Sequence, residues 1–465
     1  MSGTRFWRRL DSEIAAQVAD LRQFVTIRTF LRGLGLVYFI AFLSFGVQAA
    51  GLVGSHGIVP FENFLKAIRA EFGGSAWRVV PTVVWLAPKD GTLTAVWVLG
   101  CIAGIVAAMG KWQRPALAAC LVFWLSICAV GQDFLGFQWD ALLVETGFLA
   151  IFATLSPVRI LLFRWLAFRL MFFSGYVKLA SHDPNWRNLT ALHYHYETQP
   201  LPNPVSWLMY QLPMAFQKFS TGLTLASELV VPFLFFLPRW WRGWAAWIMI
   251  GLQALVFLTG NYTFFNLLAA LLMMWMFIGP ERLPKLTALD IALPALVGLL
   301  SVLVCLAQLS IPLPPGGAAI LHFAAPFEIV NSYGLFAVMT TDRDEIIVEG
   351  SNDGTNWKAY EFKYKPGALD RAPPIVAPHQ PRLDWQMWFA ALETYQQNRW
   401  FVNFVVRLLE GEPAVTHLLA YDPFAGTHPM FVRARLWRYH FTKFGEKGWW
   451  TREFRGEYIP VVSLK

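Results

Sequence analysis

Charged side chains stand inside two consecutive stretches of the chain that are otherwise apolar, residues 134–152 and 160–180. An ionised group at the centre of a bilayer costs about 2.5–3.5 kcal/mol on insertion scales, so each of these groups needs a partner or a task. The first stretch carries Asp140 and Glu145, and the second carries Arg164, Arg169 and Lys178. Acids on one stretch and bases on the next favour ion pairs between the two.

The spacing predicts which groups pair. If the two stretches form an antiparallel hairpin that turns near Pro157, equal distances from the turn place Glu145 level with Arg169. The same counting places Asp140 about one helical turn from Lys178. We therefore expect a ladder of ion pairs inside the membrane.

Two roles are open for these groups. A buried ion pair that fixes the register of two helices is the simpler role, and we favour it for Glu145 and Arg169. Glu228, in a later apolar stretch, can join this intramembrane polar cluster. Asp140 and Lys178 lie near the mouth of the helices, beside an unusual loop. These two are also candidates for catalysis, with Lys178 as a base and Asp140 as its charge partner.

That loop, at 181–213, gathers polar and aromatic side chains next to a membrane surface. They include His182, Asp183, Trp186, His193, Tyr194, His195 and Glu197. Two histidines separated by one residue do not converge on one metal ion, either in a helix or on one face of a strand. We therefore expect no metal site here, and interpret the loop as a hydrogen-bonded lid over the helices.

The elements that must position these residues are membrane-spanning helices. The chain is 56% hydrophobic and only 15% charged, whereas soluble domains are roughly 25% charged. Several apolar stretches approach the ~20 residues that cross a bilayer. We predict an α-helical polytopic membrane protein of about nine spans, near 34–53, 91–109, 115–131, 135–155, 160–179, 219–237, 243–260, 263–279 and 288–310.

Basic residues predict the orientation of the bundle, which we place at 34–312. The amphipathic amino-terminal segment 1–33 is rich in arginine, and the alternate turns of the bundle carry Lys111, Arg114, Arg159, Arg239, Arg242, Arg282 and Lys285. This face should be cytoplasmic. The outward face then receives loops 54–90 and 180–218. Segment 76–88 is too short to span and is interpreted as interfacial or re-entrant.

The net charge and the positions of the cysteines also exclude some functions. The net charge of +8 is explained by membrane orientation rather than by nucleic-acid binding, because the soluble part has no basic stripe with interleaved aromatic residues. All four cysteines lie in apolar stretches. We therefore expect no disulfides or thiol chemistry in the soluble part.

Residues 320–465 change to a mixed composition that predicts a β-rich soluble domain with a helical insert. Strands are expected at Gly334–Thr341, Glu345–Gly350, Trp357–Tyr364 and Pro429–Thr442, with a hairpin turn at Ser351–Gly354 and helices around 384–395 and 398–410. The proline-rich segment 366–382 should be extended. No nucleophile elbow or phosphate-binding glycine loop is present.

Tryptophans in the helical insert have two interpretations. Trp385, Trp388 and Trp400 belong to a group of aromatic residues that is large for a small core. They either pack the helices onto the sheet or form an exposed patch that binds a client protein.

Long motifs of the chain resemble the lipase maturation factor family. They are GQDFLGFQWDALLVETGFLAIF, SGYVKLASHDPNWRNLTALHYHYETQPLPNPVSW, NSYGLFAVMTTDRDEIIVEGSNDGTNWKAYEFKYKPG and DRAPPIVAPHQPRLDWQMWFA. The resemblance extends from about 34 to 460. In its animal members this family acts at the endoplasmic reticulum membrane and helps dimeric secreted lipases to fold. The resemblance implies a maturation factor for secreted lipases or other exported proteins, with membrane lipids as its surroundings and no cofactor.

A more distant resemblance bears on mechanism. Val177-Lys178-Leu179, followed by Asp183-Pro184-Asn185-Trp186, is similar to the segment that carries the catalytic lysine of vitamin K-dependent carboxylases. This resemblance implies an alternative function, a membrane enzyme that uses Lys178 as a base on a quinone-like or lipid substrate. We favour the non-enzymatic factor. Because its exported domain has no disulfide, we expect a bacterial inner membrane, with the amino terminus in the cytoplasm and the carboxyl-terminal domain in the periplasm.

Overall fold

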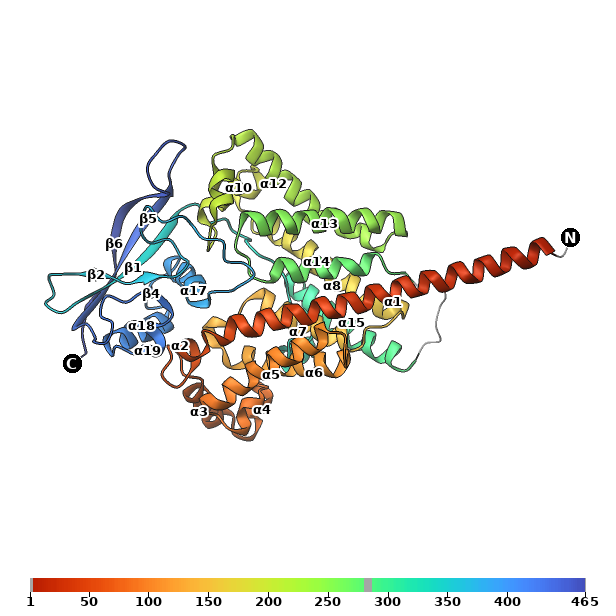
Figure 1. Ribbon diagram of the computed structural model, residues 1–465, viewed down its shortest axis with the longest axis horizontal. Coiled ribbons are helices and arrows are strands. Elements are labelled where there is room, and N and C mark those ends of the chain that lie inside the picture. Colours follow the sequence, from red (N-terminus) through yellow and green to blue (C-terminus); the bar gives the residue numbers. More distant parts are fainter. Residues whose placement is uncertain (1–2, 280–286, 465) are drawn as a thin grey trace.

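The computed structural model describes residues 3–279 and 287–464 (Figure 1). The chain opens with one long helix, α1 (Gly3–Gly46), whose part from Gln23 onward is long and apolar enough to cross a membrane. The span predicted at 34–53 therefore starts too far along the chain. Arg28 and Arg32 suggested a polar segment, but they lie on the exposed side of the helix, while Phe30 and Leu34 are fully buried.

Within the residues that the structure describes, seven helices meet the length and apolar composition of a membrane span. They are α1, α5 (Asp90–Ala108), α6 (Gln113–Val130), α8 (Pro157–Ala180), α12 (Met214–Leu229) with η4 (Val231–Phe236), α13 (Arg239–Thr259) and α15 (Leu289–Gln308). The spans predicted at 135–155 and 263–279 are shorter helices, α7 (Gln138–Ile151) and α14 (Phe265–Met273) followed by η5 (Met274–Met276). The predicted fold class is confirmed.

Small residues let the first helices approach one another. α1 packs along α5, and a Cβ atom on Gly35 would lie only 2.8 Å from the carbonyl oxygen of Gly104. Such close backbone approach is how helices associate where no water is available to drive packing.

The loops contain short helices. The first loop holds α2 (Ala49–Val53), α3 (Phe61–Phe72), η1 (Gly73–Ser75), α4 (Ala76–Val79) and η2 (Val83–Leu86), and the turn before α7 holds η3 (Gln132–Phe134). Segment 76–88 does not form a span, as predicted. The second loop folds into α9 (Pro184–Arg187), α10 (Ala191–Thr198) and α11 (Pro204–Tyr210).

The carboxyl-terminal part follows α16 (Gly317–Ala324) and η6 (Ala325–Phe327). Its main antiparallel sheet has the order β2-β1-β5-β6, formed by β1 (Arg343–Ser351), β2 (Lys358–Ala359), β5 (Phe431–Phe441) and β6 (Trp450–Val462). β3 (Glu361–Phe362) pairs with β4 (Leu419–Tyr421). The helices α17 (Arg382–Ala391), α18 (Arg399–Leu409) and α19 (Pro413–Thr416) lie between the sheet and the bundle (Figure 1).

The predicted hairpin, the strand at 429–442 and the two helices of the insert are confirmed. The turn forms because one carboxylate oxygen of Asp353 accepts from the backbone N–H groups of Thr355 and Asn356. The strand predicted at 334–341 is wrong, because this segment has no strand partner. β6 was missed, since its Arg- and Glu-rich sequence hides the apolar alternation.

One cluster of buried side chains is continuous from the bundle into the carboxyl-terminal domain. At the junction, Trp139 of α7 stacks on Phe137 at 4.9 Å and meets Trp385 of α17 edge to face at 4.9 Å. Figure 1 shows this domain at one end of the bundle and the amino terminus at the other. The bundle and the domain are therefore joined through a dry interface.

Candidate functional site

Lys178, in the last turn of α8, pairs with Glu228 of α12. Its Nζ atom lies 2.8 and 2.6 Å from the two carboxylate oxygens and donates to the carbonyl of Ser174 at 3.2 Å. It also faces the ring of Trp186 at 5.2 Å. Both charged groups are largely buried, so each neutralises the other.

The predicted pair of Asp140 with Lys178 is wrong. Asp140 binds Arg382 of α17 instead, through two bonds of 2.9 and 3.0 Å between fully buried groups. Arg382 also donates to the carbonyl of Phe134 at 2.6 Å. The cation that neutralises Asp140 comes from the carboxyl-terminal domain, so the spacing within the two apolar stretches does not reveal it.

The other predicted pair is confirmed, since Arg169 of α8 binds Glu145 of α7. The chain that leaves α16 completes this cluster. Arg169 donates to the carbonyl of Asn331 at 2.8 Å, and Tyr333 donates its hydroxyl to Glu145 at 2.7 Å. Glu228 lies with Lys178 and is not part of this group. Both charged groups of this buried pair therefore have several hydrogen-bond partners, as a structural role requires.

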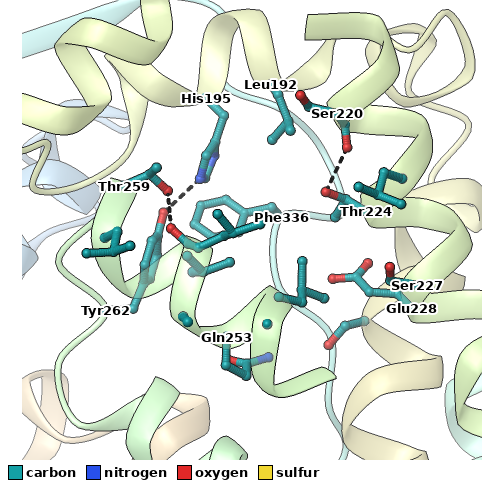
Figure 2. Close-up of a pocket in the computed structure, with 18 of the residues that line it drawn as sticks. Leu192, His195, Ser220, Thr224, Ser227, Glu228, Gln253, Thr259, Tyr262 and Phe336 are labelled. Atoms are coloured by element: carbon teal, nitrogen blue, oxygen red, sulfur yellow. Dashed lines mark hydrogen bonds between the residues drawn. The ribbon is translucent and has the colours of Figure 1, made fainter. Parts of the chain in front are cut away.

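Beside the Lys178–Glu228 pair lies an apolar cavity of about 660 Å³ (Figure 2). Its walls come from α8, α10, α12, α13 and the segment at 335–336. Polar groups are few, and Figure 2 shows most of them at the edges: Ser220, Thr224, Ser227 and Glu228 from α12, Gln253 and Thr259 from α13, His195 from α10 and Tyr262. Asp140 is not among the lining residues.

The histidines of the lid have different surroundings. His195 points toward the cavity, where its Nε2 hydrogen-bonds with the hydroxyl of Tyr262 at 2.9 Å. Burial and the nearby Lys178 lower the pKa of His195 to about 4, so its ring is neutral. His193 stacks on the ring of Tyr210 and contacts that of Tyr194. Across residues 3–279 and 287–464 there is no group of three metal-ligating side chains.

The front of the lid binds the segment that was predicted as a strand. Asp183 caps α9 and accepts from the backbone N–H of Met339 at 2.6 Å, and the indole of Trp186 donates to the carbonyl of Phe336 at 2.9 Å. His182, which is exposed, contacts Arg187. Several backbone groups of 336–340 thus bond to side chains of the lid instead of to a neighbouring strand.

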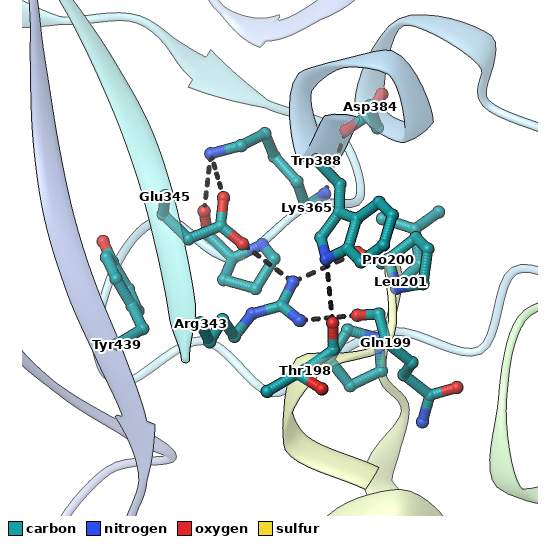
Figure 3. A network of polar contacts seen from close by, with 12 residues as sticks. Thr198, Gln199, Pro200, Leu201, Arg343, Glu345, Lys365, Asp384, Trp388 and Tyr439 are labelled. Carbon is teal, nitrogen blue, oxygen red and sulfur yellow. Dashed lines mark hydrogen bonds and ion pairs between the residues drawn. The ribbon is translucent and has the colours of Figure 1, made fainter. Parts of the chain in front are cut away.

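The back of the lid binds the β domain through Arg343 of β1 (Figure 3). The guanidinium donates to the carbonyls of Glu197 and Gln199 at 2.8 and 2.5 Å, and to Glu345 at 2.7 Å. Lys365 binds the same carboxylate, at 2.8 Å from Glu345. The Glu197 side chain accepts from the backbone of Phe441 at 2.6 Å. The lid and the β domain are therefore in direct contact through buried polar groups.

Asn261, in the turn after α13, joins the lid to the proline-rich segment. Its amide donates to the carbonyls of Leu201 at 3.1 Å and Pro374 at 2.9 Å, while its oxygen accepts from the N–H groups of Val376 and Ala377. It is 2% exposed. Sequence reasoning did not find Asn261, Arg343, Tyr333 or Arg382, because no local pattern distinguishes a polar residue that will be buried by distant segments.

Two family models match the chain. The lipase maturation factor transmembrane domain matches residues 25–280, and the lipase maturation factor C-terminal domain matches residues 329–460. The chain belongs to the lipase maturation factor family. Lipase maturation factor 2 of Gallus gallus is 36% identical, over 94% of this chain and 81% of its own length. Lipase maturation factor 2 of Homo sapiens and lipase maturation factor 1 of Bos taurus are each 34% identical, over 94% and 93% of this chain and 82% and 88% of their own lengths. No solved structure matches.

In this member of the lipase maturation factor family, buried polar contacts join the two matched domains. Asp140 with Arg382, and Glu145 with Tyr333, each link a residue of the transmembrane match to one of the C-terminal match. The domains are thus parts of one unit.

The family matches give the carboxylase-like alternative no support. The geometry gives none either, because Asp140 is bound by Arg382 and the three N–H groups of Lys178 face acceptors on Ser174 and Glu228.

Of the two interpretations of the tryptophans in the insert, the exposed client-binding patch is wrong, because all three rings are buried. Trp385 and Trp400 are 2% exposed, and Trp388 is buried with its indole donating to the carbonyl of Thr198 at 2.8 Å. Trp400 packs on Phe134. These rings form the dry junction between the two domains. This explains why the insert contains more aromatic residues than the core of a small domain requires.

Proposed function

We propose that this protein is a membrane-embedded maturation factor that assists the folding or assembly of secreted lipases or other exported proteins. The observation that carries the proposal is the match of both halves of the chain to relatives named lipase maturation factors, along 94% of its length. The buried ion pairs of Asp140 with Arg382 and of Glu145 with Arg169 agree with a non-catalytic role, because they fix the arrangement of helices and domain.

We further propose that the amino terminus is cytoplasmic and that the lid and β domain face the periplasm of a bacterial inner membrane. Support comes from Lys111 between α5 and α6, Arg114 in the first turn of α6, Arg159 in the first turn of α8, and Arg239 and Arg242 in the first turn of α13. The helices α6, α8 and α13 begin at the end of the bundle away from the β domain (Figure 1).

A client would meet side chains that the fold leaves exposed. Phe444, at the tip between β5 and β6, is 65% exposed and contacts Trp207 of the lid. Phe454 on β6 is 52% exposed. We propose these rings, in place of the buried tryptophans, as client contacts close to the membrane surface.

The test is deletion of the gene in its host, followed by assay of secreted lipase activity relative to lipase protein. The specific activity should fall, and the wild-type gene should restore it, while Phe444→Ala with Phe454→Ala should restore it only in part without loss of the factor itself. Unchanged activity of the lipases, together with an unchanged set of other exported proteins, would reject the proposal.

A further inference from the structure

The apolar cavity beside Lys178 opens toward the region of acyl chains. Its walls include Phe219 and Leu223 of α12 and Trp247 and Leu255 of α13, all more than half exposed although they line the cavity. Both helices are apolar enough to span a membrane. Exposed apolar side chains on such helices face lipid, so molecules of the bilayer reach the cavity between α12 and α13 without crossing water.

The cavity accepts an apolar chain of substantial size. Its volume of about 660 Å³ lies within the ~300–1,000 Å³ of ordinary ligand sites. Gly251 lies in its wall, and a Cβ atom added there would meet nothing within 4 Å. The space beside α13 is therefore open rather than filled by neighbouring side chains.

The polar groups of the cavity carry no unbalanced charge. Lys178 and Glu228 neutralise each other, and His195 is neutral. A charged headgroup inside would stay unpaired in a medium of low dielectric constant, which is strongly unfavourable. The hydroxyl of Ser227, next to the ion pair, has no hydrogen-bond partner among the residues that the structure describes. An uncharged oxygen of a ligand, such as an ester carbonyl, fits this place.

We propose that this cavity is a binding site for one acyl chain of a bilayer phospholipid, which enters between α12 and α13 and brings its ester group to Ser227 and the Lys178–Glu228 pair. The headgroup, with its charges, remains outside between the helices. A free fatty acid fits less well, because its carboxylate would compete with Glu228 for Lys178. This inference does not depend on the proposed function.

The test uses the full chain reconstituted in phosphatidylcholine vesicles that contain phosphatidylcholine with a diazirine on one acyl chain. After irradiation, mass spectrometry should find the label on cavity-facing residues of α12. The variant Gly251→Phe fills the cavity and should lower this labelling by about tenfold, equivalent to 1.4 kcal/mol. Gly243→Phe is the matched control. It lies on the same helix outside the cavity, and a Cβ atom there also meets nothing within 4 Å.

Equal labelling of α12 in the wild type and in Gly251→Phe would overturn the proposal, since the probe would then report only lipid around the protein. Labelling by a diazirine fatty acid but not by the phospholipid, or an apolar peptide found in the cavity in place of lipid, would overturn it too. If Gly251→Phe lowers the melting temperature more than Gly243→Phe does, Gly251→Leu, with less added volume, takes its place with Gly243→Leu as control.

Discussion

Arg382 and Asp140 lie 242 positions apart in the chain, yet the guanidinium of the first binds both carboxylate oxygens of the second, at 2.9 and 3.0 Å. The backbone N–H of Arg382 also donates to the side chain of Gln48 at 2.9 Å. Helix α17 of the β domain thus begins inside the bundle. Docking of the domain onto the membrane part consequently depends on buried polar groups, such as Asp140 and Arg382, whose partners lie in the other part.

Removal of one partner of this pair should destabilise the protein strongly. Arg382→Met leaves the carboxylate of Asp140 buried without a counter-charge, which costs about 3–5 kcal/mol. Thermal unfolding in detergent should show the loss. The double variant Asp140→Leu with Arg382→Met should recover most of it, because no charge is then left unpaired. A double variant as unstable as Arg382→Met would contradict the assignment.

The tryptophans at the junction of the two domains should contribute as much to stability as the ion pair of Arg382 with Asp140. Trp385→Ala removes a buried ring that packs against Trp139, so we expect a loss of about 3–5 kcal/mol and faster proteolysis between the domains. Trp77, which is 62% exposed, is the control, and its replacement by Ala should change stability by less than about 0.5 kcal/mol. Similar effects of the two variants would argue against a dry junction.

Acid should weaken the contact between α1 and the proline-rich segment. His379 hydrogen-bonds with Ser44 at 2.9 Å, and burial together with Arg382 lowers its pKa from 6.5 to about 4. Between pH 4 and pH 6.5 the unfolded chain binds more protons at His379 than the folded chain does. The contribution of His379 to the free energy of unfolding is therefore complete above about pH 6.5 and is lost as the pH drops toward 4. The loss should be about 2 kcal/mol after allowance for partial exposure.

Comparison of melting temperatures at pH 7 and pH 5 for the wild type and His379→Asn checks this. The variant should lose less on acidification. Part of the slope should persist, because the pKa of His195 is lowered in the same direction. An identical slope in both proteins would show that His379 is not the group that titrates.

Lys178 and Glu228 should be replaceable as a pair. Lys178→Met alone leaves a carboxylate with little access to water and should lower stability by about 3 kcal/mol. With Glu228→Leu added, stability and complementation of the deletion strain should return, since the pair positions helices. If the stable double variant does not complement, Lys178 has a role in the activity itself.

The proposed orientation can be tested with single cysteines at exposed sites. A membrane-impermeant maleimide added to cells with a permeable outer membrane should label Glu446→Cys in the β domain. It should not label Lys111→Cys at the opposite end of the bundle until the inner membrane is opened. The native cysteines provide the background, since Cys101 and Cys120 are buried. The reverse pattern would invert the orientation.

Local geometry made one pair predictable and another not. Glu145 and Arg169 lie on two consecutive helices, at equal distances in sequence from the turn near Pro157. Counting residues from that turn therefore predicts that they pair. The same counting failed for Asp140, because its counter-charge arrives from a segment far along the chain. Ion pairs between neighbouring helices are visible in a sequence, whereas pairs that close a domain interface depend on the complete fold.

The β domain shows the same division. The turn around Asp353 is stabilised by a carboxylate within the turn itself, which accepts a hydrogen bond from the backbone of Thr355. The turn was therefore predictable from the local sequence. Segment 334–341 has the composition of a strand, but its backbone partners are side chains of the lid, such as Asp183 and Trp186. Its assignment was decided by tertiary contacts that override local preference.

The side-chain amide of Asn261 forms hydrogen bonds only with main-chain atoms of its neighbours. Peptide groups are the same in every residue, so the identities of the side chains at 201–202 and 374–377 are not read by this amide. These stretches are free to diverge, provided that the path of the backbone stays the same. A change at Asn261 itself, by contrast, would release several peptide groups together.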